Sequence, residues 1–122
     1  MYIQTHINKQ VFKTKVLTNK EDIRLGMMGK KFTSQFDALL FVMKTPTSSF
    51  WMKNCIVPLD VIFIENSKIT KIHHNCPPCP KDTECESYEG NGKLVIEMPG
   101  GTCKHFNIRK CNIVTFIVNK IK

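Results

Sequence analysis

The residues best suited to chemistry lie in one short run near the middle of the chain, where an aromatic ring, a cation, an amide and a carboxylate occur close together. Trp51, Lys53, Asn54 and Asp60 carry these groups. An aromatic wall with a few convergent polar groups is typical of a pocket for a small polar ligand, so these four residues are our ligand-binding candidates. Packing explains the same residue types, with Trp51 as a core anchor, Asn54 as a turn former and Asp60 as an acceptor for backbone amides. We favour packing because these are common structural devices.

A proline-rich loop holds the second group of reactive side chains. Cys76, Cys79 and Cys85 follow a Cys-x2-Cys-x5-Cys pattern, and further zinc ligands are available from His73, His74, Cys103 and His105. A structural zinc site commonly uses two separated ligand pairs, and only one is present, so we expect neither a metal nor a cofactor. A disulfide is the second interpretation, and reduced, structurally neutral thiols are the favoured one. The prolines beside the sulfurs remove amide donors, which argues against thioredoxin-like redox chemistry.

Common catalytic signatures do not occur in the sequence. It contains no glycine-rich phosphate loop, no Gly-x-Ser-x-Gly turn and no His-Glu-x-x-His helix. Its four histidines also lack a neighbouring nucleophile with an orienting carboxylate. We therefore expect no ordinary kinase, hydrolase or metalloprotease, and we assign no catalytic residue.

Short apolar runs and alternating patterns predict the strands that position these residues. Strands are expected at two places within residues 2–16 and at 39–42, 57–64, 68–72, 94–98 and 113–118. The runs 57–64 and 68–72 read as a β-hairpin joined by a short polar turn. Strict alternation in its second strand places Ile69 inward and Lys71 outward, whereas its first strand is apolar enough to be buried on both faces.

One short helix is expected near the N-terminal end. Thr18 and Glu21 have the spacing of a capping box, in which both side chains satisfy free amides of the first helical turn. We place the helix at residues 19–28, ending at a glycine. Residues 47–49 are expected to form a loop, and residues 75–92 are expected to be the least regular segment.

The composition is that of a globular protein. The chain has 122 residues, of which 42% are hydrophobic, and no repeat or low-complexity linker divides it. We therefore expect one domain spanning residues 1–122. One helix among several short strands predicts a mainly β fold, a small bent antiparallel sheet or a barrel-like domain.

The formal net charge is +8, and every basic residue except Arg24 and Arg109 is a lysine. Lysine attracts anions without the specific two-pronged contacts that arginine makes to phosphates and bases. The charge could therefore attract nucleic acid non-specifically, but we favour the interpretation that the lysines form an ordinary solvated surface. The apolar runs are too short to span a membrane. The N-terminal residues lack a signal-peptide pattern, so we expect a cytoplasmic location or a place within a larger assembly.

Several motifs in order give the chain a resemblance to a known family. They are the segments 24–28, 40–42, 50–64 and 95–101, together with Cys85 and Tyr88. With these motifs the chain resembles the domain of unknown function 192 family over most of its length, most strongly at residues 50–64. The resemblance implies a compact β-rich fold of one domain and no assigned activity. The Gly-Asp pair that typically precedes that family's last strand is replaced here by Lys110-Cys111-Asn112.

These observations favour a non-enzymatic binding or interaction domain, in which the segment 50–64 lines a groove or stabilises the core. The first alternative is a structural or assembly component of a larger particle, viral particles included, that contacts protein partners through its basic surface and strand edges. The second alternative is a small enzyme that uses Lys53 and Asp60. A cleft shared by Trp51, Lys53 and Asp60 would favour binding or catalysis.

Overall fold

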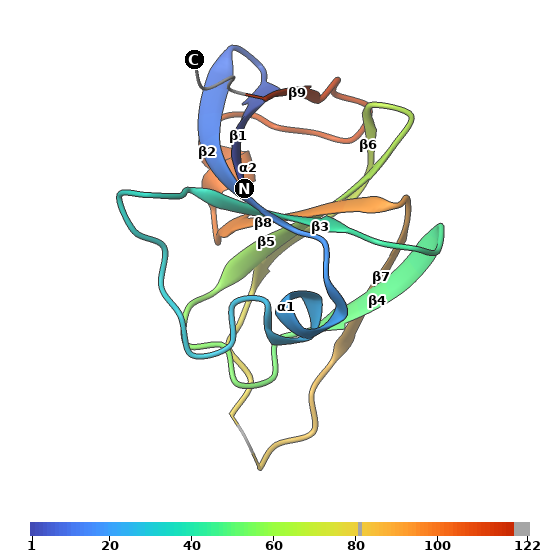
Figure 1. Ribbon diagram of the computed structural model, residues 1–122. Helices are drawn as coiled ribbons and strands as arrows, with labels where there is room; N and C mark the ends of the chain where they lie inside the picture. Colours follow the sequence, from blue (N-terminus) through green and yellow to red (C-terminus); the bar gives the residue numbers. More distant parts are fainter. Residues whose placement is uncertain (81, 119–122) are drawn as a thin grey trace.

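The computed structural model describes residues 1–80 and 82–118, and within them the chain is mainly β (Figure 1). The strands are β1 (Tyr2–Ile7), β2 (Gln10–Leu17), β3 (Ala38–Val42), β4 (Thr47–Trp51), β5 (Leu59–Glu65), β6 (Lys68–Cys76), β7 (Ser87–Asn91), β8 (Leu94–Pro99) and β9 (Thr115–Ile117). The helices are α1 (Lys20–Leu25) and α2 (Thr102–His105). This architecture confirms the expected fold class, with a second short helix in addition to the one expected.

Seven strands form one curled sheet in the order β6-β5-β8-β3-β2-β1-β9 (Figure 1). Neighbouring strands in this sheet run antiparallel, apart from β2 and β3, which are parallel. The sheet is therefore mixed, where the sequence predicted an antiparallel one. The difference arises because α1 and a long loop lie between β2 and β3, and a parallel pair needs such a crossover connection.

The central strands of this sheet have apolar residues on both faces. In β5, Leu59, Val61 and Phe63 belong to one core cluster, while Ile62 and Ile64 belong to the other. Successive side chains of a strand point to opposite faces, so the sheet separates two cores. We call the first face, which also holds Met27 near α1, the α1 face, and we call the second, which holds Cys103 of α2, the α2 face. The expectation that this strand is buried on both sides is confirmed.

A two-stranded ribbon made of β4 and β7 packs on the α1 face. Phe50 of β4 contacts the Phe63 ring edge-on, with 5.8 Å between ring centroids. A glycine is required at position 90 of β7, because a Cβ there would collide with the Phe63 ring. The sequence had predicted a loop at residues 47–49 and irregular structure at 75–92. The loop prediction is wrong, and the second prediction is wrong for β7 but agrees with the described residues between β6 and β7. The ribbon was missed because its pairing comes from a partner about forty residues away along the chain.

The N-cap of α1 lies one residue after the predicted cap, Thr18. Asn19 is the N-cap, and its Oδ1 accepts the Asp22 backbone N–H at 2.8 Å. The Asn19 amide also donates to the Asp22 carboxylate at 2.6 Å. The capping box predicted at Thr18 and Glu21 is therefore wrong, since a neighbouring residue of equal capping ability takes the position. The helix spans Lys20–Leu25, so it is also shorter than the expected 19–28.

The hairpin predicted in the middle of the chain is confirmed. β5 and β6 pair antiparallel, Ile69 is buried at 1% exposure and Lys71 is exposed. β6 extends four residues beyond its predicted end, to Cys76. Within the described residues, no helix has the length and apolar character needed to cross a membrane.

Candidate ligand-binding site

A small pocket of about 210 Å³ lies on the α1 face, between α1, β3, β4 and β8. Its lining is mainly apolar and aromatic. The lining residues are Ile23, Arg24, Leu25, Gly26, Met27, Met28, Phe41, Met43, Ser49, Phe50, Trp51, Cys55 and Glu97. An apolar pocket with few polar groups is the usual form of a small-molecule site, so we take this one as the candidate and call it the Glu97 pocket.

Glu97 is the acidic group of this pocket and belongs to the central strand β8. It lies between Leu39 of β3 and Val61 of β5 in the strand register, and both neighbours are buried hydrocarbons. Its exposure is 4%, and no hydrogen bond or salt bridge to its carboxyl group occurs among the described residues. Burial alone raises the pKa of Glu97 to about 8. The carboxyl group is therefore mostly protonated at neutral pH.

Aromatic rings form much of the pocket wall. Phe41 of β3 meets Phe50 of β4 edge-on, with 5.1 Å between ring centroids. Trp51 follows Phe50 and is 51% exposed. The Lys53 Nζ atom lies 5.0 Å from the centroid of the Trp51 ring, which is within the range of a cation–π contact. The pocket thus combines aromatic rings with one buried acid, and Lys53 lies against the Trp51 ring at its edge.

The short helix α1 and the turn after it complete the pocket. Gly26, just after the helix, has a φ of 44°, and a Cβ at this position would lie 3.2 Å from Phe41 and 3.8 Å from the Glu97 Oε1 atom. A side chain here would therefore be strained and would narrow the space over the acid. Arg24 is exposed and forms a salt bridge to Glu21 of 2.6 Å, so the charge of its guanidinium is already paired.

Asp60 lies on the opposite face of the sheet from this pocket. Its Oδ1 accepts the backbone N–H groups of Asn75 at 2.7 Å and Gly101 at 3.1 Å, and its Oδ2 accepts that of Cys103 at 2.8 Å. It is fully buried, so the interpretation of Asp60 as an acceptor for backbone amides is confirmed. No cleft shared with Trp51 and Lys53 is formed, because alternation along β5 directs Asp60 to the α2 face.

The other two candidates occupy the loop after β4. Asn54 has a φ of 61° and turns the chain, as the packing interpretation predicts. Lys53 is partly buried beside the Trp51 ring. The prediction that Trp51 is a core anchor is wrong, because half of its surface is open to solvent while its neighbour Phe50 takes the inward position.

The cysteine loop does not assemble the three thiols as a metal site. Cys79 and Cys85 form a disulfide, where the sequence favoured reduced thiols. Their Cα atoms are 5.9 Å apart, a usual distance for a disulfide. Cys76 is buried and free, and burial raises its pKa to about 11. Among the residues that the structure describes, no group of three or more metal-binding side chains occurs.

Glu97 is the site residue that the sequence analysis did not select. One signal was present, because Glu97 is the single charged residue in the apolar run Leu94-Val95-Ile96-Glu97-Met98. A charge at a position whose neighbours predict full burial marks either an error in the strand register or a functional group. The observed register retains the strand, and Glu97 is buried in it.

Comparisons with known proteins agree with the fold and leave the chemistry open. The model of the family DUF192, described as an uncharacterized ACR, matches residues 2–116. A protein of unknown function from Novosphingobium aromaticivorans DSM 12444 is similar in structure, with a TM-score of 0.76 and 23% identity over 93% of this chain and 82% of that one. A protein from Sinorhizobium meliloti 1021 named "putative transcription regulator" has a TM-score of 0.76 and 19% identity over 94% of this chain and 92% of that one. No curated protein matches the chain significantly.

Proposed function

Because the chain belongs to the DUF192 family, whose description assigns no activity, we propose from its own geometry that it is a binding protein for a small organic amine, held in the Glu97 pocket. The observation that carries the proposal is the buried carboxyl group of Glu97, which has no partner among the described residues and lies in an aromatic pocket. All four segments that carry the family resemblance, at 24–28, 40–42, 50–64 and 95–101, contribute to the same pocket.

The chemistry of the lining favours a cation as the ligand's polar group. Phe41 and Phe50 present ring systems that attract an ammonium group, and Glu97 supplies a negative charge once it ionises. An amine that enters the pocket gives this buried carboxylate the partner that it lacks, so its ionised form is stabilised. Binding at neutral pH therefore releases a proton from Glu97.

The size of the pocket limits the ligand. Its volume of about 210 Å³ is below the roughly 300–1,000 Å³ of pockets that hold drug-sized molecules. The ligand is therefore a small amine with an apolar body, such as one aromatic ring or a short branched chain. Arg24 at the pocket does not repel it strongly, because Glu21 neutralises the guanidinium.

A binding role is also supported by the protonation state of the remaining reactive side chain. Cys55 is the one thiol that lines the pocket, and burial together with the nearby Glu97 raises its pKa to about 12. The thiolate is the reactive form of cysteine, so this group is a poor nucleophile at neutral pH.

The test compares two ligands of the same shape, 2-phenylethylamine and 2-phenylethanol. Trp51 is the only tryptophan of the chain and lines the pocket, so its fluorescence reports occupancy directly. We expect the amine to bind and the alcohol to bind much more weakly at pH 8. The amine should bind roughly fiftyfold more tightly at pH 8 than at pH 6, because the ionised fraction of Glu97 rises from about 1% to about half while the amine stays charged.

Two matched variants separate the pocket from general charge effects. Glu97→Gln should abolish the preference for the amine and its pH dependence, whereas Glu65→Gln, which removes an exposed acid from the end of β5, should leave both unchanged. Equal binding of the two ligands by the wild-type protein, or an amine affinity that falls between pH 6 and pH 8, would contradict the proposal. Trp51 fluorescence that changes with protein concentration but not with added amine would favour the alternative that the protein is an assembly component of a larger particle.

A further inference from the structure

A second cavity, of about 860 Å³, lies on the α2 face and is lined by basic side chains from separate segments. Lys71 and His74 come from β6, Lys104 comes from α2, and Arg109 and Lys110 come from the segment that follows α2. None of the acidic residues lines this cavity, and all ten lie in the described part of the chain. We call it the basic cavity. Four residues that carry a full positive charge therefore contribute to the lining of one concave space.

The charges around the basic cavity are not balanced by carboxylates. None of its four cations forms a salt bridge within the described residues. Asp60 lies beneath the cavity floor, but its two oxygens accept three backbone N–H groups, all of them from lining residues: Asn75, Gly101 and Cys103. Asp60 forms no salt bridge to the cations of the cavity within the described residues, so its buried carboxylate acts on them only at a distance.

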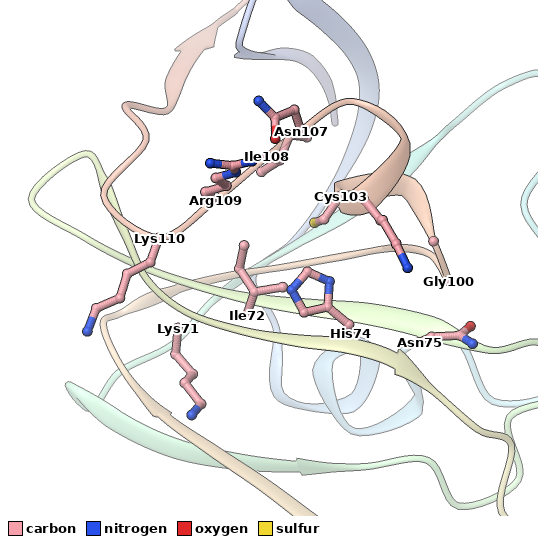
Figure 2. Close-up of a pocket in the computed structure, with 12 residues that line it drawn as sticks. Lys71, Ile72, His74, Asn75, Gly100, Cys103, Asn107, Ile108, Arg109 and Lys110 are labelled. Carbon is pink, nitrogen blue, oxygen red and sulfur yellow. The ribbon is translucent and has the colours of Figure 1, made fainter.

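The segment that carries Arg109 is held in place by its backbone. The Arg109 N–H donates to the Asn112 side chain at 2.7 Å, and the Cys111 N–H donates to the Ile69 carbonyl of β6 at 2.8 Å. Ile108 is buried at 2% exposure and anchors the same segment in the core. Figure 2 shows His74 on the side of β6 that faces Asn107 and Arg109, while the Lys71 side chain extends from the other side of that strand.

We propose that the basic cavity binds a small anion that carries two or more phosphate groups. A guanidinium matches phosphate oxygens in a two-pronged geometry, and the lysines add point charges from several directions. His74 is the only aromatic side chain in the lining, so the cavity offers no stacking platform of the kind that single-stranded nucleic acids use. Its concave form also does not match the flat surface of a membrane.

Pyrophosphate is the probe, and binding is measured by isothermal titration calorimetry in about 0.15 M salt, where exposed charges are screened beyond about 8 Å. The test variant Lys104→Gln/Arg109→Gln removes two cations from the cavity. The control variant Lys30→Gln/Lys31→Gln removes two exposed cations that do not line it, so both variants lower the net charge of +8 by two. We expect the dissociation constant to rise roughly tenfold or more in the test variant and to stay within about twofold of wild type in the control.

The altered side chains are exposed, so thermal denaturation should show that both variants fold like the wild-type protein. Equal weakening in the two variants would mean that only the total charge matters, and it would overturn the proposal. Absence of pyrophosphate binding to the wild-type protein would also overturn it. Tighter binding of duplex DNA or of phosphatidylserine vesicles than of pyrophosphate, lost in the same test variant, would assign the surface to a macromolecule instead.

Discussion

The buried acid of the Glu97 pocket makes a direct prediction about stability and pH. Glu97 has a pKa of about 8 in the folded protein and an ordinary value near 4.5 when exposed. A carboxyl group whose folded pKa is raised binds its proton more tightly in the folded state. Its effect on stability is therefore most favourable at low pH, and stability falls as the pH rises from about 4.5 to about 8. Glu97→Gln keeps the shape and removes the titration.

The magnitude follows from the size of the pKa shift. Each pH unit between about 4.5 and 8 removes about 1.4 kcal/mol from the wild-type protein relative to Glu97→Gln. The difference in the free energy of unfolding, variant minus wild type, should therefore increase by about 2.5 kcal/mol from pH 5 to pH 7. The conversion applies because Glu97 is only 4% exposed, so solvent screening is small.

Urea unfolding of both proteins at pH 5, 6, 7 and 8 measures this gap. Subtracting the two curves cancels every other titrating group, provided that the substitution does not alter their environments. Glu65→Gln is the control, and its difference from wild type should vary little over the same range because the acid is exposed. A difference between wild type and Glu97→Gln that stays constant with pH, or that shrinks as the pH rises, would refute the assignment of a raised pKa to Glu97.

Three further tests, which use five substitutions, concern packing on both faces of the sheet. Asn19→Ala should lower the free energy of unfolding by about 1 kcal/mol through loss of the helix cap, and Thr18→Ala should change it little. A larger loss for Thr18→Ala than for Asn19→Ala in urea unfolding would mean that Thr18 is the cap after all. Trp51→Ala should lower the free energy of unfolding by less than about 1 kcal/mol, because Trp51 is half exposed. Phe63→Ala should lower it by about 3–5 kcal/mol, because Phe63 is fully buried. Similar losses of stability in the two variants would mean that Trp51 is a core anchor. Asp60→Asn should destabilise by about 2–4 kcal/mol, because an amide cannot accept all three backbone N–H bonds; a neutral result in thermal or urea unfolding would remove its structural role.

Local pattern was sufficient for most of the strands. Alternating or continuous apolar runs predicted β1, β2, β3, β5, β6, β8 and β9, because the pleat of a strand converts sequence spacing of two directly into a buried face. The same rule placed Ile69 inside and Lys71 outside. The ribbon β4–β7 was missed because its polar and glycine-rich residues lack that pattern, and its pairing depends on a partner distant in sequence.

The candidate site was only partly accessible from the sequence. The segment at residues 50–64 was correctly singled out as unusual, and Trp51 from it lines the pocket. Lys53 and Asp60 were grouped with Trp51 because they are close in the chain, yet alternation along β5 sends Asp60 to the opposite face. Proximity in sequence says little about which face of a sheet a residue joins once a turn intervenes.

The sequence by itself determined the fold class of this protein, the approximate place of α1 and the burial of its central strands, because these follow from short-range periodicity and residue type. Only the tertiary structure decided which distant segments meet. The unpartnered Glu97 carboxyl arises where β3, β5 and β8 lie side by side, and the basic cavity arises where β6 faces the segment after α2. Both sites depend on contacts between residues far apart in the chain. The burial of the Glu97 carboxyl group and the repulsion among the cations of the basic cavity arise only when those contacts form.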